Sequence, residues 1–198
     1  MSSDSDSWDD WAGGWDDDPA ARAYSRAAHG SLIEELDRRA ISLAGAHVLD
    51  FGCGTGLLTE QLVDEAASIH AVDLSPKMLA VLDAKAERHG WTTVTTSLTV
   101  PDDATTWDLI VCSSVCSFLD DYPGTVRELA DRLRAGAMFI QWDWEADGPG
   151  AEHGLARTEI SDALQAAGLA DVEVRTAFSV PFEDQAMEPL LGSGVRAS

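Results

Sequence analysis

In HVLDFGCGTGLL, residues 47–58, an apolar strand pattern runs directly into three glycines. Its first five residues predict a strand, and Gly52, Gly54 and Gly56 stand at alternate positions after it. Glycine tolerates positive φ and lets a ligand approach the backbone closely. A turn of this kind after a strand is typical of a site for an anionic cofactor, and its surroundings indicate which one.

Two acidic residues narrow the choice of ligand. Asp50 stands directly before the turn, where a carboxylate repels a pyrophosphate and attracts an ammonium group. Asp73 ends the next predicted strand, about 23 residues later, where an acid suits the two hydroxyls of an adenosine ribose. A dinucleotide fingerprint has the spacing Gly-x-Gly-x-x-Gly, whereas here the third glycine comes one residue early. The pattern predicts a ligand with a ribose and an amine; a tight turn without a ligand is the alternative.

The rest of the chain alternates between strand and helix patterns. Strands are predicted at residues 47–51, 68–72, 93–98, 107–115, 137–144, 171–178 and 190–196, and helices at 19–43, 57–64, 76–89, 124–133 and 157–167. This alternation predicts an α/β fold: a Rossmann-like, doubly wound, mostly parallel seven-stranded sheet with helices on both faces. Ligands bind such sheets beyond the carboxyl ends of the strands, which places function near residues 52–56, 73, 98–103, 113–120 and 142–147.

The composition indicates one globular domain, residues 19–198, with a strongly negative charge. No apolar stretch reaches the roughly 18 to 20 residues that a membrane span needs. The formal net charge is -22, with 13 basic residues against 35 acidic ones, so neither nucleic acid nor an anionic membrane is an expected partner. A salt-rich cytoplasm and a composition rich in Ala, Asp and Arg would each explain the acidity. The polar, acidic start is unlike a secretory signal, so a cytoplasmic location is expected.

Cysteine and histidine spacing does not favour a metal site, and no metal is expected. Cys53, Cys112 and Cys116 are an odd number, which favours free, buried thiols. The five histidines are scattered, and only His153 lies in a predicted loop that could reach the site.

Residues 1–18 form an acidic segment that also carries Trp8, Trp11 and Trp15. Its seven aspartates favour disorder, whereas three large aromatic side chains favour a segment that folds over something. The segment is therefore predicted to be either disordered or an N-terminal helical lid.

VLDFGCGTG together with AVDLSPKML resembles motifs I and II of the class I S-adenosylmethionine-dependent methyltransferases. The similarity continues through WDLIVCSSVCSFLDD, LRAGAMFIQWDW and ISDALQAAGLADVEV, and so covers the chain from about residue 45 to its end. This resemblance implies S-adenosylmethionine as cofactor and S-adenosylhomocysteine as product. It also implies in-line transfer of a methyl group to a small-molecule acceptor.

The resemblance implies cofactor-binding roles at strand ends, in the glycine turn and in the lid. Asp50 would favour the amine of the cofactor, Asp73 would bind its ribose hydroxyls, and Leu74 and Met78 would border its adenine. The full set is Asp50, Gly52, Cys53, Gly54, Gly56, Asp73, Leu74, Met78, Ser97, Leu98, Cys112, Ser113 and Trp15, with Asp102 as a further candidate.

The sequence names no catalytic base, since methyl transfer needs one only when the acceptor is protonated. Trp142 and Trp144 are interpreted either as a substrate wall or as core residues. The candidates to face the substrate follow two predicted strands: Ser117, Phe118, Asp120, Trp142, Trp144 and Glu145. SSVC replaces [DN]-P-P-[YF] after the fourth strand and no Pro-Cys pair occurs, which disfavours methylation of amino groups on DNA bases or glutamine and of cytosine C5. The expected acceptor is a neutral or cationic small molecule.

The sequence is also compatible with two other functions. One is a non-catalytic, S-adenosylmethionine-binding partner protein. The other is a nicotinamide-dependent oxidoreductase, which the glycine spacing and the charge of Asp50 disfavour. The sequence does not predict the oligomeric state.

Overall fold

A computed structural model describes residues 4–102, 106–146, 154–182 and 185–197. The chain forms two compact units, residues 1–103 and 104–198. No helix in the described ranges is both long and apolar enough to cross a bilayer.

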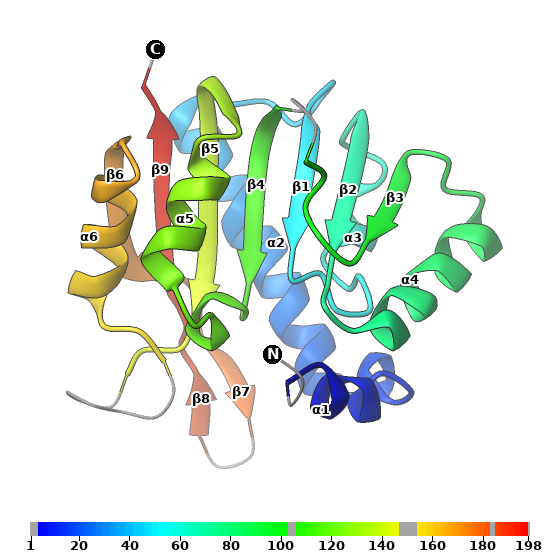
Figure 1. Cartoon of the computed structure of the whole chain (residues 1–198). Helices are drawn as coiled ribbons and strands as arrows, with labels where there is room; N and C mark the ends of the chain where they lie inside the picture. Colours follow the sequence, from blue (N-terminus) through cyan, green and yellow to red (C-terminus); the bar gives the residue numbers. More distant parts are fainter. Residues whose placement is uncertain (1–3, 103–105, 147–153, 183–184, 198) are drawn as a thin grey trace. The chain divides into compact units, whose positions relative to one another are not determined.

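The first unit contains three parallel strands, which pair in the order β3-β2-β1 (Figure 1). They are β1 (His47–Phe51), β2 (Ser68–Val72) and β3 (Val94–Ser97). In their register Phe51 lies opposite Val72, and Val72 lies opposite Ser97. The three strands therefore end level with one another, so the segments that follow them leave the sheet at one edge.

The helices of the first unit are α1 (Asp4–Trp11), the 3-10 turn η1 (Trp15–Asp17), α2 (Pro19–Arg39), α3 (Thr59–Leu62) and α4 (Pro76–His89). Local capping explains where the two longest begin. The Asp18 side chain accepts a hydrogen bond from Ala20 N at 2.8 Å, and Ser75 Oγ accepts one from Met78 N at 3.1 Å. In both helices proline follows the cap, where its missing N–H costs nothing.

Two glycines of the first unit give opposite predictions for substitution by alanine. Gly56 has φ +82°, and a Cβ there would lie 2.4 Å from Cδ1 of the fully buried Leu82. We expect Gly56→Ala to lower the free energy of unfolding by about 2 to 4 kcal/mol, because the alanine would strain the backbone and overpack the core.

Gly30 lies inside α2 with open space around it, so Gly30→Ala should raise the free energy of unfolding by about 0.5 to 1 kcal/mol. Urea unfolding of both variants checks the two signs; equal midpoints would contradict them.

The second unit carries four strands in the order β4-β5-β9-β6, with β4 and β5 parallel and β9 antiparallel to both neighbours. The strands are β4 (Trp107–Ser113), β5 (Leu133–Asp143), β6 (Leu169–Thr176) and β9 (Leu190–Arg196), with a separate hairpin of β7 (Val180–Phe182) and β8 (Gln185–Met187). Its helices are η2 (Cys116–Phe118), α5 (Tyr122–Ala130) and α6 (Arg157–Ala166). A Cβ at Gly192 would lie 2.4 Å from Ile160 Cγ2, so glycine there lets α6 pack closely on β9.

The predicted fold class is confirmed, since seven strands form one mostly parallel sheet. Several boundaries differ from the prediction. The helix predicted at 57–64 is only Thr59–Leu62, the helix predicted at 124–133 ends at Ala130, and β5 begins at Leu133. The hairpin β7–β8 was not predicted, because its strands are too short to show a periodic pattern.

Candidate functional site

The glycine turn after β1 is tied to the end of β2. Gly52, Gly54 and Gly56 all have positive φ, at 73°, 54° and 82°. The amides of Gly52 and Cys53 both donate to Val72 O, at 2.7 and 3.0 Å. A Cβ at Gly54 would meet nothing within 4 Å, so there is free space beside this backbone. The turn has the shape and the room to receive a ligand.

Asp73 is fixed by the same turn. One carboxylate oxygen accepts from Gly54 N and the other from Ser75 N, both at 2.8 Å. Burial raises the pKa of Asp73, and the two amide hydrogen bonds oppose that rise. Each carboxylate oxygen keeps further acceptor capacity. Asp73 is therefore held in place while still able to accept two hydroxyl donors, as a ribose diol would supply.

Asp50 is a buried carboxylate in which only one of the two oxygens accepts a hydrogen bond from the described residues. It is 1% exposed, and Thr59 Oγ1 donates to its Oδ2 at 2.6 Å. Its Oδ1 is buried and has no hydrogen-bond partner in the described part of the chain. Burial raises the pKa of Asp50 to about 6, against the Thr59 hydrogen bond and with a further rise from the charge of Asp73. An unsatisfied buried carboxylate oxygen is costly, and an ammonium group or a water bound to one would satisfy it.

Apolar side chains stand beside Asp73. Leu74 is 64% exposed and Leu98 is 49% exposed, and they follow the paired strands β2 and β3. Met78, two residues into α4, is buried. Exposed leucines next to a carboxylate that can still accept hydroxyl donors would suit a flat aromatic base.

Ser97 is already engaged by its own surroundings. His70 Nε2 lies 2.8 Å from its hydroxyl, the hydroxyl donates to Thr99 O at 2.6 Å, and its carbonyl accepts from Asp73 N at 3.3 Å. Asp102 is exposed, and Asp103 lies outside the described residues. Leu98 and its backbone stay the expected ligand contact at this end of β3, and contacts of Ser97 and Asp102 stay predictions as well.

The second unit holds its own polar cluster, at the end of β5. Asp143 Oδ1 accepts from Ser117 N at 3.0 Å, and Oδ2 accepts from Gln141 Nε2 at 3.1 Å. Tyr122 Oη in turn donates to Gln141 Oε1 at 2.8 Å. Burial raises the pKa of Asp143 to about 7, and hydrogen bonds, first from the Ser117 amide, oppose that rise. This cluster fixes η2, which carries the half-exposed Phe118.

The other predicted residues are placed as follows. Cys53, Cys112 and Cys116 are free and buried, as predicted, and burial raises the pKa of the Cys53 and Cys116 thiols well above the ordinary range. Trp142 is fully buried in the core, whereas Trp144 is partly exposed. Glu145 forms a two-point ion pair with Arg157, at 2.9 Å for each contact. His153 lies outside the described residues.

Trp15 lies in η1, and its ring meets Trp8 edge-on at a centroid distance of 6.4 Å. Three residues that contact the candidate site or its surroundings were not predicted from the sequence: Asp16, Lys85 and Asp143. Gln141 and Asp143 interrupt the otherwise apolar stretch 137–144 and are a visible signal for the Asp143 cluster, and the scarcity of lysine is one for Lys85.

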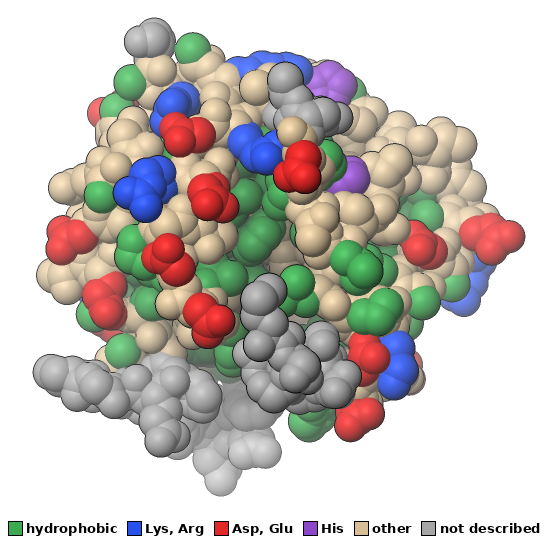
Figure 2. Space-filling model, in the orientation of Figure 1, with side chains coloured by type: hydrophobic (Ala, Val, Ile, Leu, Met, Phe, Trp, Pro, Cys, Tyr) green, Lys and Arg blue, Asp and Glu red, His purple; other side chains and the backbone are tan. Residues whose placement is uncertain are grey.

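Charged side chains are dispersed over the face drawn in Figure 2, and the described residues offer no metal-binding geometry. Figure 2 shows Asp and Glu side chains spread over the visible face, with Lys and Arg between them. Within the described ranges, no three or more His, Cys, Asp or Glu side chains are grouped so as to hold a metal ion.

Comparison with known proteins gives one consistent assignment. The family described as "Methyltransferase domain" matches residues 49–139. A malonyl-[acyl-carrier protein] O-methyltransferase of Bacillus anthracis is 30% identical over 125 residues, 62% of this chain and 46% of that protein. A ubiquinone biosynthesis O-methyltransferase of Methylocella silvestris is 32% identical over 101 residues, 50% of this chain and 40% of that protein. The chain thus spans about half the length of these curated relatives, or less.

Solved structures share the fold. Magnesium protoporphyrin IX methyltransferase from Synechocystis PCC 6803 with bound S-adenosylhomocysteine gives a TM-score of 0.70 at 17% identity, over 91% of this chain and 88% of that one. A chain of the complex between the Haloferax volcanii Trm112 methyltransferase activator and its methyltransferase gives 0.71 at 18% identity, over 96% and 98%. The strand order, the glycine turn and the matched residues agree: residues 49–139 match the methyltransferase domain family, and the fold is that of the class I S-adenosylmethionine-dependent methyltransferases.

Proposed function

We propose that this protein transfers a methyl group from S-adenosylmethionine to a small-molecule acceptor. The observation that carries the proposal is the pair of carboxylates at one edge of the first unit. Among the described residues a buried oxygen of Asp50 has no hydrogen-bond partner and would suit an amine, and Asp73 is held where it can accept two hydroxyls. S-adenosylmethionine presents both of these groups and no phosphate.

The residues of the first unit fit this cofactor. The free space beside Gly54 would admit its methionine part, with Asp50 toward the amine. Asp73 would accept from the ribose hydroxyls, and Leu74 and Leu98 would border the adenine. Cys112 and Ser113, at the end of β4, stay predicted contacts of the methionine part. When bound, the cofactor supplies an electrophilic methyl group on a sulfonium.

The protein would then contribute orientation and the exclusion of water, which are worth up to about 7 to 11 kcal/mol when alignment is good. The Asp143 cluster supports this role, because it holds η2 and the predicted substrate-facing residues Ser117 and Phe118 in one conformation. Partly exposed Trp144 is a second candidate to face the acceptor. We propose a neutral or cationic acceptor, in keeping with the net charge of -22.

Isothermal titration tests cofactor binding. We expect S-adenosylmethionine and S-adenosylhomocysteine to bind with micromolar or tighter affinity, and NADH to give neither heat nor enhanced fluorescence. Binding of NADH in place of S-adenosylmethionine would overturn the proposal.

A second experiment tests whether the protein is an enzyme. The protein is incubated with methyl-labelled cofactor and small-molecule extracts, and labelled products are sought. Transfer of label supports the proposal, whereas tight cofactor binding without labelled product in any extract would indicate a non-catalytic partner protein.

A further inference from the structure

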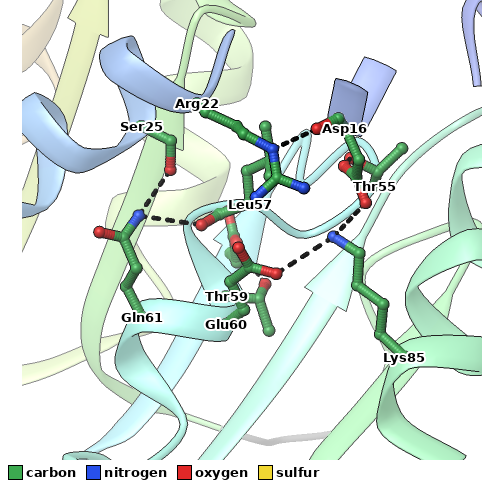
Figure 3. A network of polar contacts seen from close by, with 10 residues as sticks. Asp16, Arg22, Ser25, Thr55, Leu57, Thr59, Glu60, Gln61 and Lys85 are labelled. Carbon is green, nitrogen blue, oxygen red and sulfur yellow. Dashed lines mark hydrogen bonds and ion pairs between the residues drawn. The ribbon is translucent and has the colours of Figure 1, made fainter. Parts of the chain in front are cut away.

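Two aspartates of the N-terminal segment contact the loops that form the candidate cofactor site. Asp16 Oδ1 accepts from Thr55 Oγ1 at 2.6 Å, and Thr55 belongs to the glycine turn (Figure 3). Asp9 Oδ1 accepts from Ser75 Oγ at 2.5 Å, and Ser75 also donates its backbone N–H to Asp73. Residues 4–18, which we call the strap, are therefore attached at the glycine turn and beside Asp73.

The same two aspartates form ion pairs with the only two lysines of the chain. Lys85 Nζ lies 2.6 Å from Asp16 Oδ2, and Lys77 Nζ lies 3.6 Å from Asp9 Oδ2. Both lysines lie on α4, on which α1 packs. Since eight residues of helix rise about 12 Å, the two attachments are spaced along α4.

Charge explains why these lysines matter. The strap carries seven aspartates in a chain whose net charge is -22, so its approach to the rest of the protein is opposed by repulsion. Lys85 also faces Glu60 at 3.3 Å, so removing the lysine would leave Asp16 and Glu60 without the positive charge that they share (Figure 3).

The two ion pairs differ in strength. The Lys85 side chain is 10% exposed and that of Asp16 is 22% exposed, whereas the Lys77 side chain is 61% exposed. Exposed ion pairs are weak and screened by salt, and partly buried ones are less so. Lys85 is therefore the main attachment.

Further contacts make the strap a continuous element. Arg22 Nε, in α2, donates to Asp16 O (Figure 3), and the rings of Trp8 and Trp15 pack edge-to-face. Asp18, the last residue of the strap, caps α2. The strap is thus anchored at its C-terminal end by α2, and its grip on the glycine turn depends on Asp16.

We propose that Lys85, assisted by Lys77, is a positioning residue that holds the strap against the glycine turn and Asp73 and thereby slows the release of cofactor. The cofactor part of this inference rests on the proposed function. The attachment of the strap does not, because every contact above exists within the protein alone.

The test compares Lys85→Met with Lys85→Arg, which keeps the charge. Arg134→Met is the control, since Arg134 forms an ion pair with Asp108 in the second unit, at 2.8 Å, far along the chain from the strap. Hydrogen exchange of residues 4–18 is measured without cofactor. We expect Lys85→Met to speed exchange by about tenfold or more and the other two variants to match wild type.

The second readout is the dissociation rate of S-adenosylhomocysteine in stopped flow, followed by tryptophan fluorescence. We expect about tenfold faster release from Lys85→Met, largely restored in Lys85→Arg. In wild type, added salt should speed release less than the methionine substitution does, because the Lys85 pair is partly buried.

The outcomes are distinguishable. Unchanged exchange in Lys85→Met would overturn the attachment itself. Faster exchange with unchanged dissociation would overturn the role in cofactor retention. If wild type binds no S-adenosylhomocysteine, the proposed function and the retention role both fail, while the exchange data still decide whether Lys85 holds the strap.

Discussion

Asp73→Ala is expected to weaken binding of S-adenosylmethionine by about a hundredfold or more, because two hydrogen bonds to a charged acceptor are lost at about 1.5 to 3 kcal/mol each. The substitution also frees the amides of Gly54 and Ser75, which now donate to this carboxylate at 2.8 Å. Isothermal titration of the variant measures the effect. An affinity within twofold of wild type would contradict a role for Asp73 in binding the cofactor.

A second ligand shows whether Asp73 binds the ribose hydroxyls directly or only maintains the shape of the glycine turn. The 2′-deoxy analogue of S-adenosylhomocysteine lacks one of the hydroxyls that Asp73 would hold. If Asp73 binds the diol, Asp73→Ala should penalise this analogue less than the parent compound. Equal penalties would mean that Asp73 acts only by shaping the turn, through Gly54 and Ser75.

Asp50→Asn is expected to make the protein more stable and the cofactor site weaker. The buried carboxylate costs free energy when it is ionised, and asparagine cannot ionise. The side-chain oxygen of asparagine can still accept from Thr59 Oγ1. A neutral amide attracts an ammonium group less than a carboxylate does, so we expect affinity for S-adenosylmethionine to fall by about tenfold or more.

The gain in stability depends on pH in a defined direction. Burial raises the pKa of Asp50 from 3.8 to about 6, so between these values the native state binds more protons than the unfolded state. The stability of wild type therefore falls as pH rises from about 4 to about 6, by about 2 to 3 kcal/mol from this group alone. Above pH 6 the variant should exceed wild type by the same amount, about 2 to 3 kcal/mol, and near pH 4 the gain should vanish.

Urea unfolding at pH 4 and pH 8 measures this difference, at unchanged m-value. Asp162→Asn, at an exposed position of α6, removes the same charge without removing a buried one and serves as the control. A gain in stability that is equal at both pH values, or equal in the control, would contradict the assignment of the effect to burial of Asp50.

Local chemistry explains which elements could be predicted from the sequence. Ser75, Pro76 and Gly90 mark both ends of α4, and the structure places that helix at Pro76–His89 as predicted. The strand before the glycine turn and the strand before Asp73 also have their predicted bounds, His47–Phe51 and Ser68–Val72. Shorter elements differ from the prediction, because one turn of helix such as α3, or a three-residue strand, has too few residues to show a periodic pattern.

The class of ligand expected at the glycine turn also follows from residues that are close together in the sequence. Seven residues contain Asp50, Gly52, Gly54 and Gly56, and the spacing of the glycines together with the charge of Asp50 disfavours a dinucleotide. The structure added the unpartnered Oδ1 of Asp50 and its raised pKa, which depend on burial by residues distant in sequence.

Neighbours in the chain set the alternation of strands and helices, the carboxylate pair and the expected class of cofactor, so all three could be predicted from the sequence. The insertion of β9 between β5 and β6, the close approach of α6 at Gly192 and the contact of Asp143 with η2 follow only from the folded chain. The ion pairs of Asp16 with Lys85 and of Asp9 with Lys77 are likewise seen only in the structure. Contacts between residues so far apart in sequence depend on how the whole chain packs, and no local pattern encodes them.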